Sequence, residues 1–314
     1  MTPRDSIDFP AIRVLDGAMA TELERRGCDI AGPLWSAHVL DQSPATITAV
    51  HLDYLRAGAD CISTASYQVS ALGYRELGRP PDDAARALRQ SVDLAEQARA
   101  QYARENPRRI WIASSLGPYG AALHNGAEYH GAYSIGFDDL VAFHAERLAI
   151  LAATNADLLA LETIPSLEEA RAILRALEQY PELTAWISFT CRGAAHVAHG
   201  EPLRDCAEAL AASARVAAIG INCTAPQHVA ALIAEARLGC RDRKPIIVYP
   251  NSGETWDVAT RSWRGTSDSS HFGALARSWY AAGAQAVGGC CRTGPAQIAA
   301  VAAASRAPLP AAPP

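Results

Sequence analysis

The chain lacks the features that mark several large classes of protein. Its apolar runs are short and alanine-rich, far below the roughly 20 residues that a membrane-spanning helix needs. Residues 1–10 lack the apolar centre of a signal peptide. The 28 lysine and arginine residues are scattered along the chain, which argues against a nucleic-acid-binding surface. We therefore expect a cytoplasmic protein without a membrane or nucleic-acid partner.

Linkers and low-complexity blocks are also missing between the two ends of the chain. The sequence has 314 residues, 49% of them hydrophobic and 19% charged, with a net charge of −5, so it can bury a sizeable core. No segment rich in Pro, Gly and Ser divides it. We expect a single domain over residues 11–305, with a frayed start at 1–10 and a disordered Ala/Pro tail at 306–314.

Short apolar runs alternate regularly with amphipathic stretches. The runs have the length of buried parallel strands and lie at residues 12–15, 61–64, 110–114, 158–161, 185–189, 216–221, 246–249 and 284–287. The stretches predict helices over residues 44–57, 82–105, 137–153, 166–177, 203–212, 226–237, 271–282 and 295–304. Ser166 and Glu169 are spaced as a capping box for one of these helices. This order predicts an α/β fold, a single (β/α)8 TIM barrel. An open doubly wound sheet is the alternative, but no G-x-G-x-x-G follows the first run.

Polar residues are concentrated where these strands would end, which is where a barrel carries its active site. Cys223 follows the sixth strand, and Cys290 and Cys291 follow the eighth. Three thiolates suit zinc, and a site with three protein ligands leaves one position open, as catalytic zinc sites do. Three ordinary buried cysteines are the alternative, and Cys191 is a rival ligand because it also follows a strand.

Two carboxylates, Asp16 and Glu162, end the first and fourth strands. A carboxylate at a barrel mouth can act as a base, ligate a metal or anchor a substrate cation. Since three thiolates already provide the protein ligands of the metal, we interpret both carboxylates as anchors for an ammonium group. A purely structural ion pair is the alternative.

These motifs together resemble the homocysteine S-methyltransferases over about residues 12–304. The matching stretches are residues 15–23, 51–54, 64–68, 117–120, 162–163, 220–223, 248–254 and 288–293. The Asn222-Cys223 pair combined with Gly288-Gly289-Cys290-Cys291 is the most specific of them. The sequence lacks the long C-terminal extension of betaine-dependent relatives.

The resemblance implies an enzyme that moves a methyl group to the thiol of L-homocysteine, forming methionine. It implies zinc held by Cys223, Cys290 and Cys291, and S-methylmethionine as donor, with S-adenosylmethionine as a poorer one. Betaine or another donor, and a zinc-binding relative without catalysis, are the alternatives. We expect a monomer or a small homo-oligomer with small-molecule substrates.

The expected substrate-binding residues lie at the strand ends. They are Asp16, Gly17, Thr64, Tyr67, Glu162 and Asn222. Because a sulfonium donor is a cation, an aromatic face would bind it, and Tyr67 is the first candidate, followed by Tyr119 and Trp256. Each of these rings could equally serve loop packing.

Overall fold

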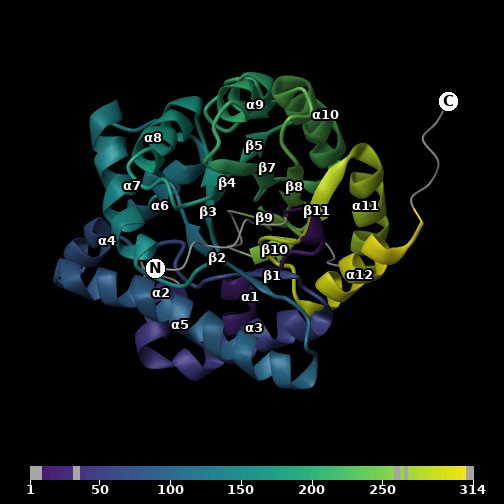
Figure 1. The fold of residues 1–314 in the computed structure, drawn as a ribbon, viewed down its shortest axis with the longest axis horizontal. Helices are drawn as coiled ribbons and strands as arrows, with labels where there is room; N and C mark the ends of the chain where they lie inside the picture. The colour runs from purple at the N-terminus through teal and green to yellow at the C-terminus, as the bar shows by residue number, and fades with distance from the viewer. Residues whose placement is uncertain (1–8, 31–35, 258–261, 265–267, 309–314) are drawn as a thin grey trace.

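A parallel sheet forms the centre of the computed structural model, which describes residues 9–30, 36–257, 262–264 and 268–308. Its seven strands run in the order β1-β2-β3-β4-β7-β8-β11. Their bounds are Cys61–Ser63, Trp111–Leu116, Leu158–Ile164, Ala185–Phe189, Val216–Asn222, Ile246–Tyr249 and Ala284–Val287. In Figure 1 these strands lie at the centre of the view and the helices surround them.

Both edges of this sheet bond to the same short segment near the N-terminus. Val14 bridges Val287 of β11, and Leu15 bridges Cys61 of β1. The Leu15 N–H donates to Val287 O at 2.9 Å, and the Asp16 N–H donates to Cys61 O at 3.1 Å. The segment therefore occupies the space between β1 and β11, and the sheet is curled.

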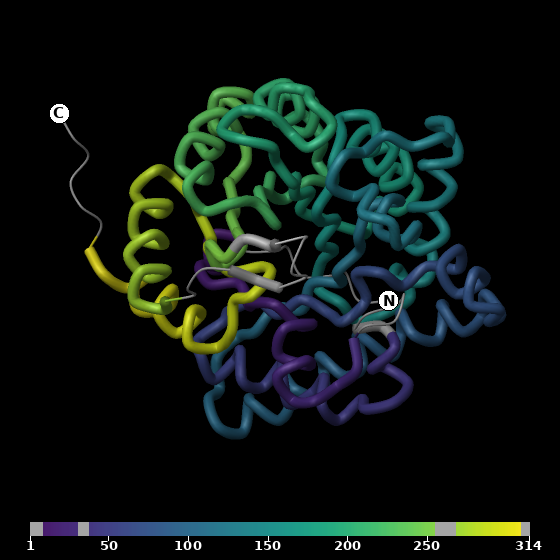
Figure 2. The backbone as a smooth tube through the Cα atoms, turned by 180° about the vertical axis from the view of Figure 1, so that it is seen from behind, coloured from purple at the N-terminus to yellow at the C-terminus, as the bar shows by residue number. Residues whose placement is uncertain are grey.

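Amphipathic helices cover the outside of the sheet, as the view from behind also shows (Figure 2). The long ones are α3 (Pro44–Ala57), α5 (Pro81–Glu105), α7 (Phe137–Ala152), α8 (Leu167–Leu177), α9 (Leu203–Ala211), α10 (Val229–Cys240), α11 (Ser269–Ala282) and α12 (Pro295–Arg306). They agree closely with the helices expected from the sequence. Among the described residues no helix has both the length and the apolar character needed to cross a bilayer.

Shorter elements, which the sequence did not predict, lie between the long ones. The helices are α1 (Met19–Arg25), α2 (Ser36–Gln42), α4 (Ala71–Glu76), α6 (Tyr119–Ala122) and the 3-10 turns η1 (Phe9–Ala11), η2 (Ala127–Tyr129) and η3 (Pro226–His228). The strands form two small hairpins, β5 (Cys191–Arg192) with β6 (His196–Val197), and β9 (Thr255–Asp257) with β10 (Ser262–Arg264).

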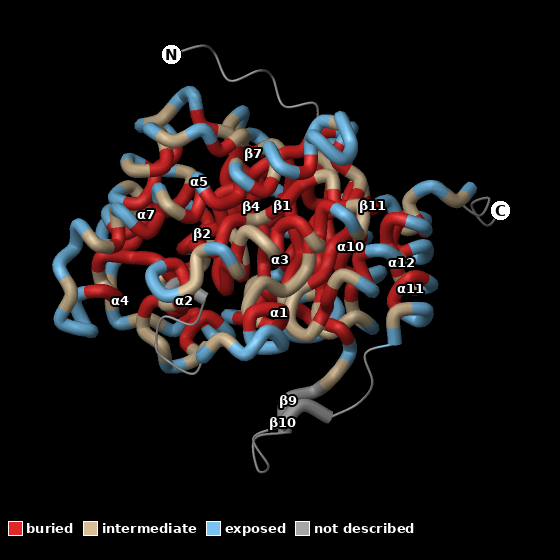
Figure 3. Tube along the Cα trace, turned by 90° about the horizontal axis from the view of Figure 1, so that it is seen from below, coloured by how far each residue is buried: buried red, intermediate tan, exposed pale blue. Residues whose placement is uncertain are grey.

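Alternate residues of each strand belong to two separate cores. Ile112 packs between sheet and helices, whereas Trp111 and Ala113 belong to the interior cluster, as period-two strand geometry requires. Phe9 enters this interior, with its ring centroid 6.5 Å from that of Trp186. Figure 3 shows the buried residues as a continuous interior, with exposed positions on the outer helix faces.

The expected capping box at α8 forms only in part. Ser166 Oγ accepts the Glu169 N–H at 3.2 Å, as expected. The Glu169 carboxylate instead accepts the Tyr119 N–H at 2.6 Å and the Tyr133 hydroxyl at 3.0 Å. A buried polar network takes the side chain that the capping box would use.

Candidate active site

Three cysteine side chains meet where β7 and β11 end. Cys223 directly follows β7, and Cys290 and Cys291 lie shortly after β11. Their Sγ atoms all lie within 4.8 Å of one another, and those of Cys223 and Cys291 are 3.7 Å apart. In the described part of the chain, this is the group of His, Cys, Asp or Glu side chains close enough to hold a metal ion.

The backbone before the adjacent cysteines depends on two glycines. The Gly288 N–H donates to Val248 O at 2.9 Å, and the Gly289 N–H donates to Asp16 O at 3.0 Å. A Cβ at Gly289 would lie only 2.2 Å from Thr293 Oγ1, so a side chain at this position would displace the turn. The glycines thus allow the chain to turn closely enough for both thiols to face the third.

Cys223 is held in an unusual backbone conformation. Its φ of 47° lies in the left-handed region, which costs a non-glycine residue about 1–3 kcal/mol. Its N–H donates to Tyr249 O at 3.3 Å, and its carbonyl accepts the Thr190 hydroxyl at 3.2 Å. Neighbouring strands therefore maintain the strained conformation that directs the thiol.

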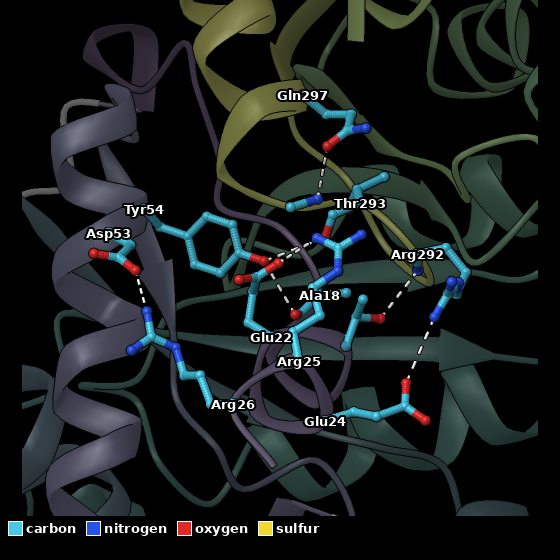
Figure 4. A network of polar contacts seen from close by, with 12 residues as sticks. Ala18, Glu22, Glu24, Arg25, Arg26, Asp53, Tyr54, Arg292, Thr293 and Gln297 are labelled. Atoms are coloured by element: carbon cyan, nitrogen blue, oxygen red, sulfur yellow. Dashed lines mark hydrogen bonds and ion pairs between the residues drawn. The ribbon is translucent and has the colours of Figure 1, made fainter. Parts of the chain in front are cut away.

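The turn carrying Cys290 and Cys291 is braced from outside by α1 and α3 (Figure 4). The Tyr54 hydroxyl lies 3.0 Å from Ala18 O and 3.2 Å from Thr293 O. The Arg292 N–H donates to Thr21 Oγ1 at 3.2 Å, and its guanidinium pairs with Glu24 at 3.5 Å. Short N-terminal elements thereby fix the position of the last two cysteines.

The chemistry of the three thiols fits a soft cation. Hydrogen bonding to Cys223 raises the pKa of the Cys290 thiol, whereas hydrogen bonds from Cys223 and Cys290 lower the pKa of Cys291. One thiolate is thus favoured at the expense of its neighbours, because adjacent negative charges repel. A bound divalent cation would remove this repulsion and stabilise all three as thiolates.

Two carboxyl groups, Asp16 and Glu162, interact electrostatically at the same end of the sheet. Asp16 Oδ2 accepts the Ser63 N–H at 2.7 Å, and Glu162 accepts the hydroxyls of Ser115 and Tyr249. Burial raises the pKa of Asp16 to about 8 and that of Glu162 to about 7. The Glu162 charge raises the pKa of Asp16 further. Both groups would ionise more readily when a cation enters between them.

Two of the expected residues have their polar atoms occupied within the protein. Thr64 Oγ1 accepts the Ser115 N–H at 3.0 Å. Asn222 Oδ1 accepts the Thr163 N–H and the Ser188 hydroxyl, and Asn222 Nδ2 donates to Thr163 Oγ1, each at 2.8 Å. Because Thr163 has a φ of 63°, Asn222 holds a strained residue directly beside Glu162.

The other expected residues lie around the mouth in different environments. The Tyr67 ring is half-buried against Gly117, where a Cβ would lie 2.8 Å from the ring. Gly17 similarly leaves no room for a Cβ, which would lie 2.9 Å from the Tyr54 ring. Tyr119 packs edge-on against the rings of Tyr133 and Phe143. The side chain of Trp256 lies outside the described part of the chain.

Cys191, the rival ligand, does not join the cysteine cluster. It lies in β5, and its Sγ is 3.9 Å from Phe189 O. Burial raises the pKa of its thiol well above the ordinary value, as for an inert core cysteine.

The sequence alone did not indicate the two residues of η2 that reach the site. The Tyr129 hydroxyl lies 3.6 Å from Cys223 Sγ, although the two residues are 94 positions apart. Glu128 beside it is buried, with an exposed fraction of 6%. The only signal in the sequence was an acidic residue next to an aromatic one in a loop after a predicted strand.

The comparisons with known proteins agree with this site. The family model for homocysteine S-methyltransferase matches residues 13–305. The homocysteine S-methyltransferase YbgG of Bacillus subtilis is 47% identical over 303 residues, 95% of each chain. The homocysteine S-methyltransferase of Escherichia coli is 45% identical over 307 residues, 96% of this chain and 98% of its own. The solved metallated form of the E. coli homocysteine methyltransferase MmuM is similar with a TM-score of 0.81 and 43% identity, covering 93% of this chain and 96% of the other.

Proposed function

The chain belongs to the homocysteine S-methyltransferase family, and from that premise we propose that it transfers a methyl group from S-methylmethionine, or less readily S-adenosylmethionine, to L-homocysteine. The convergence of three cysteine sulfurs at one end of the sheet carries this proposal. The homocysteine sulfur loses its proton and attacks the methyl carbon of the sulfonium. The S–CH3 bond of the donor breaks, and its electron pair returns to the leaving sulfur, so that methionine and a neutral thioether are formed.

We propose that Cys223, Cys290 and Cys291 hold zinc in this reaction. The ion would favour the thiolate form of the homocysteine sulfur below the free thiol pKa of about 8.5. The three cysteine thiolates keep the site electron-rich, which preserves the nucleophilicity of the incoming sulfur. Their fixed backbone, strained at Cys223 and braced at Thr293, orients the acceptor toward the methyl group.

The remaining expected residues are assigned to the two substrates. Asp16 and Glu162 bind the ammonium group of homocysteine, and Gly17 lets the backbone beside Asp16 pack closely against the Tyr54 ring. Thr64 and Asn222 position the loops around it, and the Tyr67 ring lies against the donor. The cytoplasmic location and the monomeric or small homo-oligomeric state stay predictions.

We also propose that the sheet closes as a single (β/α)8 barrel within the domain 11–305. The bridges from Val14 and Leu15 to both edge strands support an eighth strand of the barrel at this position. The site then lies at the C-terminal ends of the strands, as barrel enzymes require.

Substituting one cysteine tests this function. We expect Cys290→Ala to reduce bound zinc from about one ion per chain to near zero, with methyl transfer falling to background, because two thiolates form an incomplete site. Elemental analysis and methionine formation from S-methylmethionine measure the two effects. The matched control is Cys28→Ala, in a loop away from the cluster, which keeps both.

The donor assignment has its own test. Wild-type enzyme supplied with S-methylmethionine, S-adenosylmethionine and betaine in parallel should form methionine fastest with the first. Faster turnover with betaine would contradict the assignment of a sulfonium donor. In the cysteine experiment described above, turnover of a metal-free Cys290→Ala variant would contradict the role of zinc.

A further inference from the structure

Glu128 is a buried carboxylate for which the reaction described so far has no use. It lies in η2 with an exposed fraction of 6%. Its Oε2 atom is buried and has no hydrogen-bond partner. A backbone hydrogen bond partly stabilises the carboxyl group, but burial still raises its pKa, so a cation beside Oε2 would favour the charged form.

The η2 turn holds this carboxylate in a fixed position. Gly126 precedes it in the left-handed conformation with φ 82°, and the Ala127 N–H donates to Asn125 Oδ1 at 3.0 Å. The turn lies directly on Gly120, where a Cβ would come within 2.4 Å of Glu128 N. The backbone therefore has little freedom to move Glu128 away from the mouth of the sheet.

The charge of Glu128 acts on the site itself. It interacts electrostatically with Cys223, Cys291 and Tyr67. The buried cation Arg147, which interacts with Tyr67, donates to Gly117 O at 2.9 Å and lies 2.8 Å from His144 Nδ1. Within the described residues no cation pairs with the Glu128 carboxylate.

Three carboxyl groups, Asp16, Glu162 and Glu128, therefore act on one site. Asp16 and Glu162 act on one another. Glu128 and Glu162 both act on Cys223 and on Tyr67, and Glu128 also acts on Cys291. Homocysteine carries one cationic group, its ammonium, and S-methylmethionine carries two, an ammonium and the sulfonium. Glu128 is the one of these three carboxyl groups that the binding of the homocysteine ammonium group by Asp16 and Glu162 leaves without a role.

We propose that Glu128 binds the positive charge of a sulfonium methyl donor, with the Tyr67 ring beside it. This inference rests on the proposed function and assigns its donor subsite. The sulfonium charge disappears as the methyl group leaves, so the carboxylate binds the donor more tightly than the thioether product. Glu128 therefore lowers the KM for the donor without raising kcat, and it favours product release.

The test compares Glu128→Gln with wild-type enzyme containing its metal. The amide keeps the size of the side chain but removes its charge. We expect the KM for S-methylmethionine to rise about 10- to 100-fold, the scale of a lost charge-assisted contact, with kcat within about threefold. The KM for homocysteine, the zinc content and the inhibition by methionine, a neutral thioether, stay unchanged. Glu168→Gln, at an exposed position of α8, is the matched control and leaves all of these unchanged.

Each other outcome overturns the inference. An unchanged donor KM in Glu128→Gln excludes a role in binding the donor charge. An equal rise in the KM for S-methylmethionine and the KM for homocysteine means that the carboxylate serves the acceptor or the fold. Equilibrium binding of S-methylmethionine to wild-type enzyme and to Glu128→Gln separates affinity from turnover. Failure of the proposed function is distinct, because wild-type enzyme would then use no sulfonium donor at all.

Discussion

At the scale of single residues, the site combines fixed sulfur atoms with two carboxyl groups whose pKa values lie near neutral pH. Burial raises the pKa of Glu162 to about 7 and that of Asp16 to about 8. Ser63, Ser115 and Tyr249 orient these groups. Near pH 7 each carboxyl group is therefore only partly charged, and an ammonium group beside it would favour the charged form.

This predicts a pH-dependent affinity for homocysteine. Below pH 7 the Glu162 carboxyl is protonated, so the ammonium group binds weakly, and binding strengthens as pH rises from 6 to 8. The KM for homocysteine should fall across this range in wild-type enzyme. Glu162→Gln should have a KM about 10- to 100-fold higher with much less pH dependence, because the amide does not ionise.

Metal analysis serves as the control for that experiment. Zinc should stay near one ion per chain in Glu162→Gln, as Glu162 lies outside the cysteine cluster. Loss of the metal, or a pH profile parallel to that of wild type, would contradict the assignment of this carboxylate to the substrate.

At the scale of elements, a buried network connects α7, α8 and the start of α6. Glu169 is fully buried and accepts from the Tyr119 N–H and the Tyr133 hydroxyl. His144 Nε2 lies 3.0 Å from it, and the buried Arg147 interacts with its charge. The network holds Tyr119 and Tyr133 on either side of η2, whose Tyr129 hydroxyl lies 3.6 Å from Cys223 Sγ.

We therefore expect Glu169→Ala to destabilise the protein by about 3–5 kcal/mol, because Arg147 would remain buried without its counter-charge. Urea denaturation measures the loss. The adjacent Glu168→Ala, exposed in the first turn of α8, should change the free energy of unfolding by less than about 0.5 kcal/mol. Equal losses in both variants would show that the network contributes nothing specific.

The long elements could be predicted from the sequence because their apolar periods are clear. The helix expected at 44–57 coincides with α3, and the strand expected at 185–189 coincides with β4. The cysteine cluster followed from the rule that strand ends converge. Short elements such as η2 have too few residues to show an apolar periodicity, so the sequence could not place Glu128 and Tyr129 near Cys223. The sequence predicts a local cap for the Glu169 side chain because its actual partners lie up to 50 positions away along the chain.

At the scale of the whole molecule, one more buried group couples folding to pH. His51, on α3, is fully buried, and neither ring nitrogen has a hydrogen-bond partner. Burial lowers its pKa from 6.5 to about 4. Above pH 6.5 the ring is neutral in the folded and the unfolded chain, so it contributes no pH dependence there.

Stability should fall as pH decreases from 6.5 to 4, because the unfolded chain then binds a proton at His51 that the folded chain excludes. The total loss from this residue is about 3 kcal/mol. Since Gln does not titrate, His51→Gln should remove that part of the slope when the free energy of unfolding is measured by urea at successive pH values. His271→Gln, at an exposed position of α11, is the matched control and should retain the wild-type slope. Parallel profiles for wild type and His51→Gln would mean that the buried ring gains a proton within the fold, and that α3 opens to admit water.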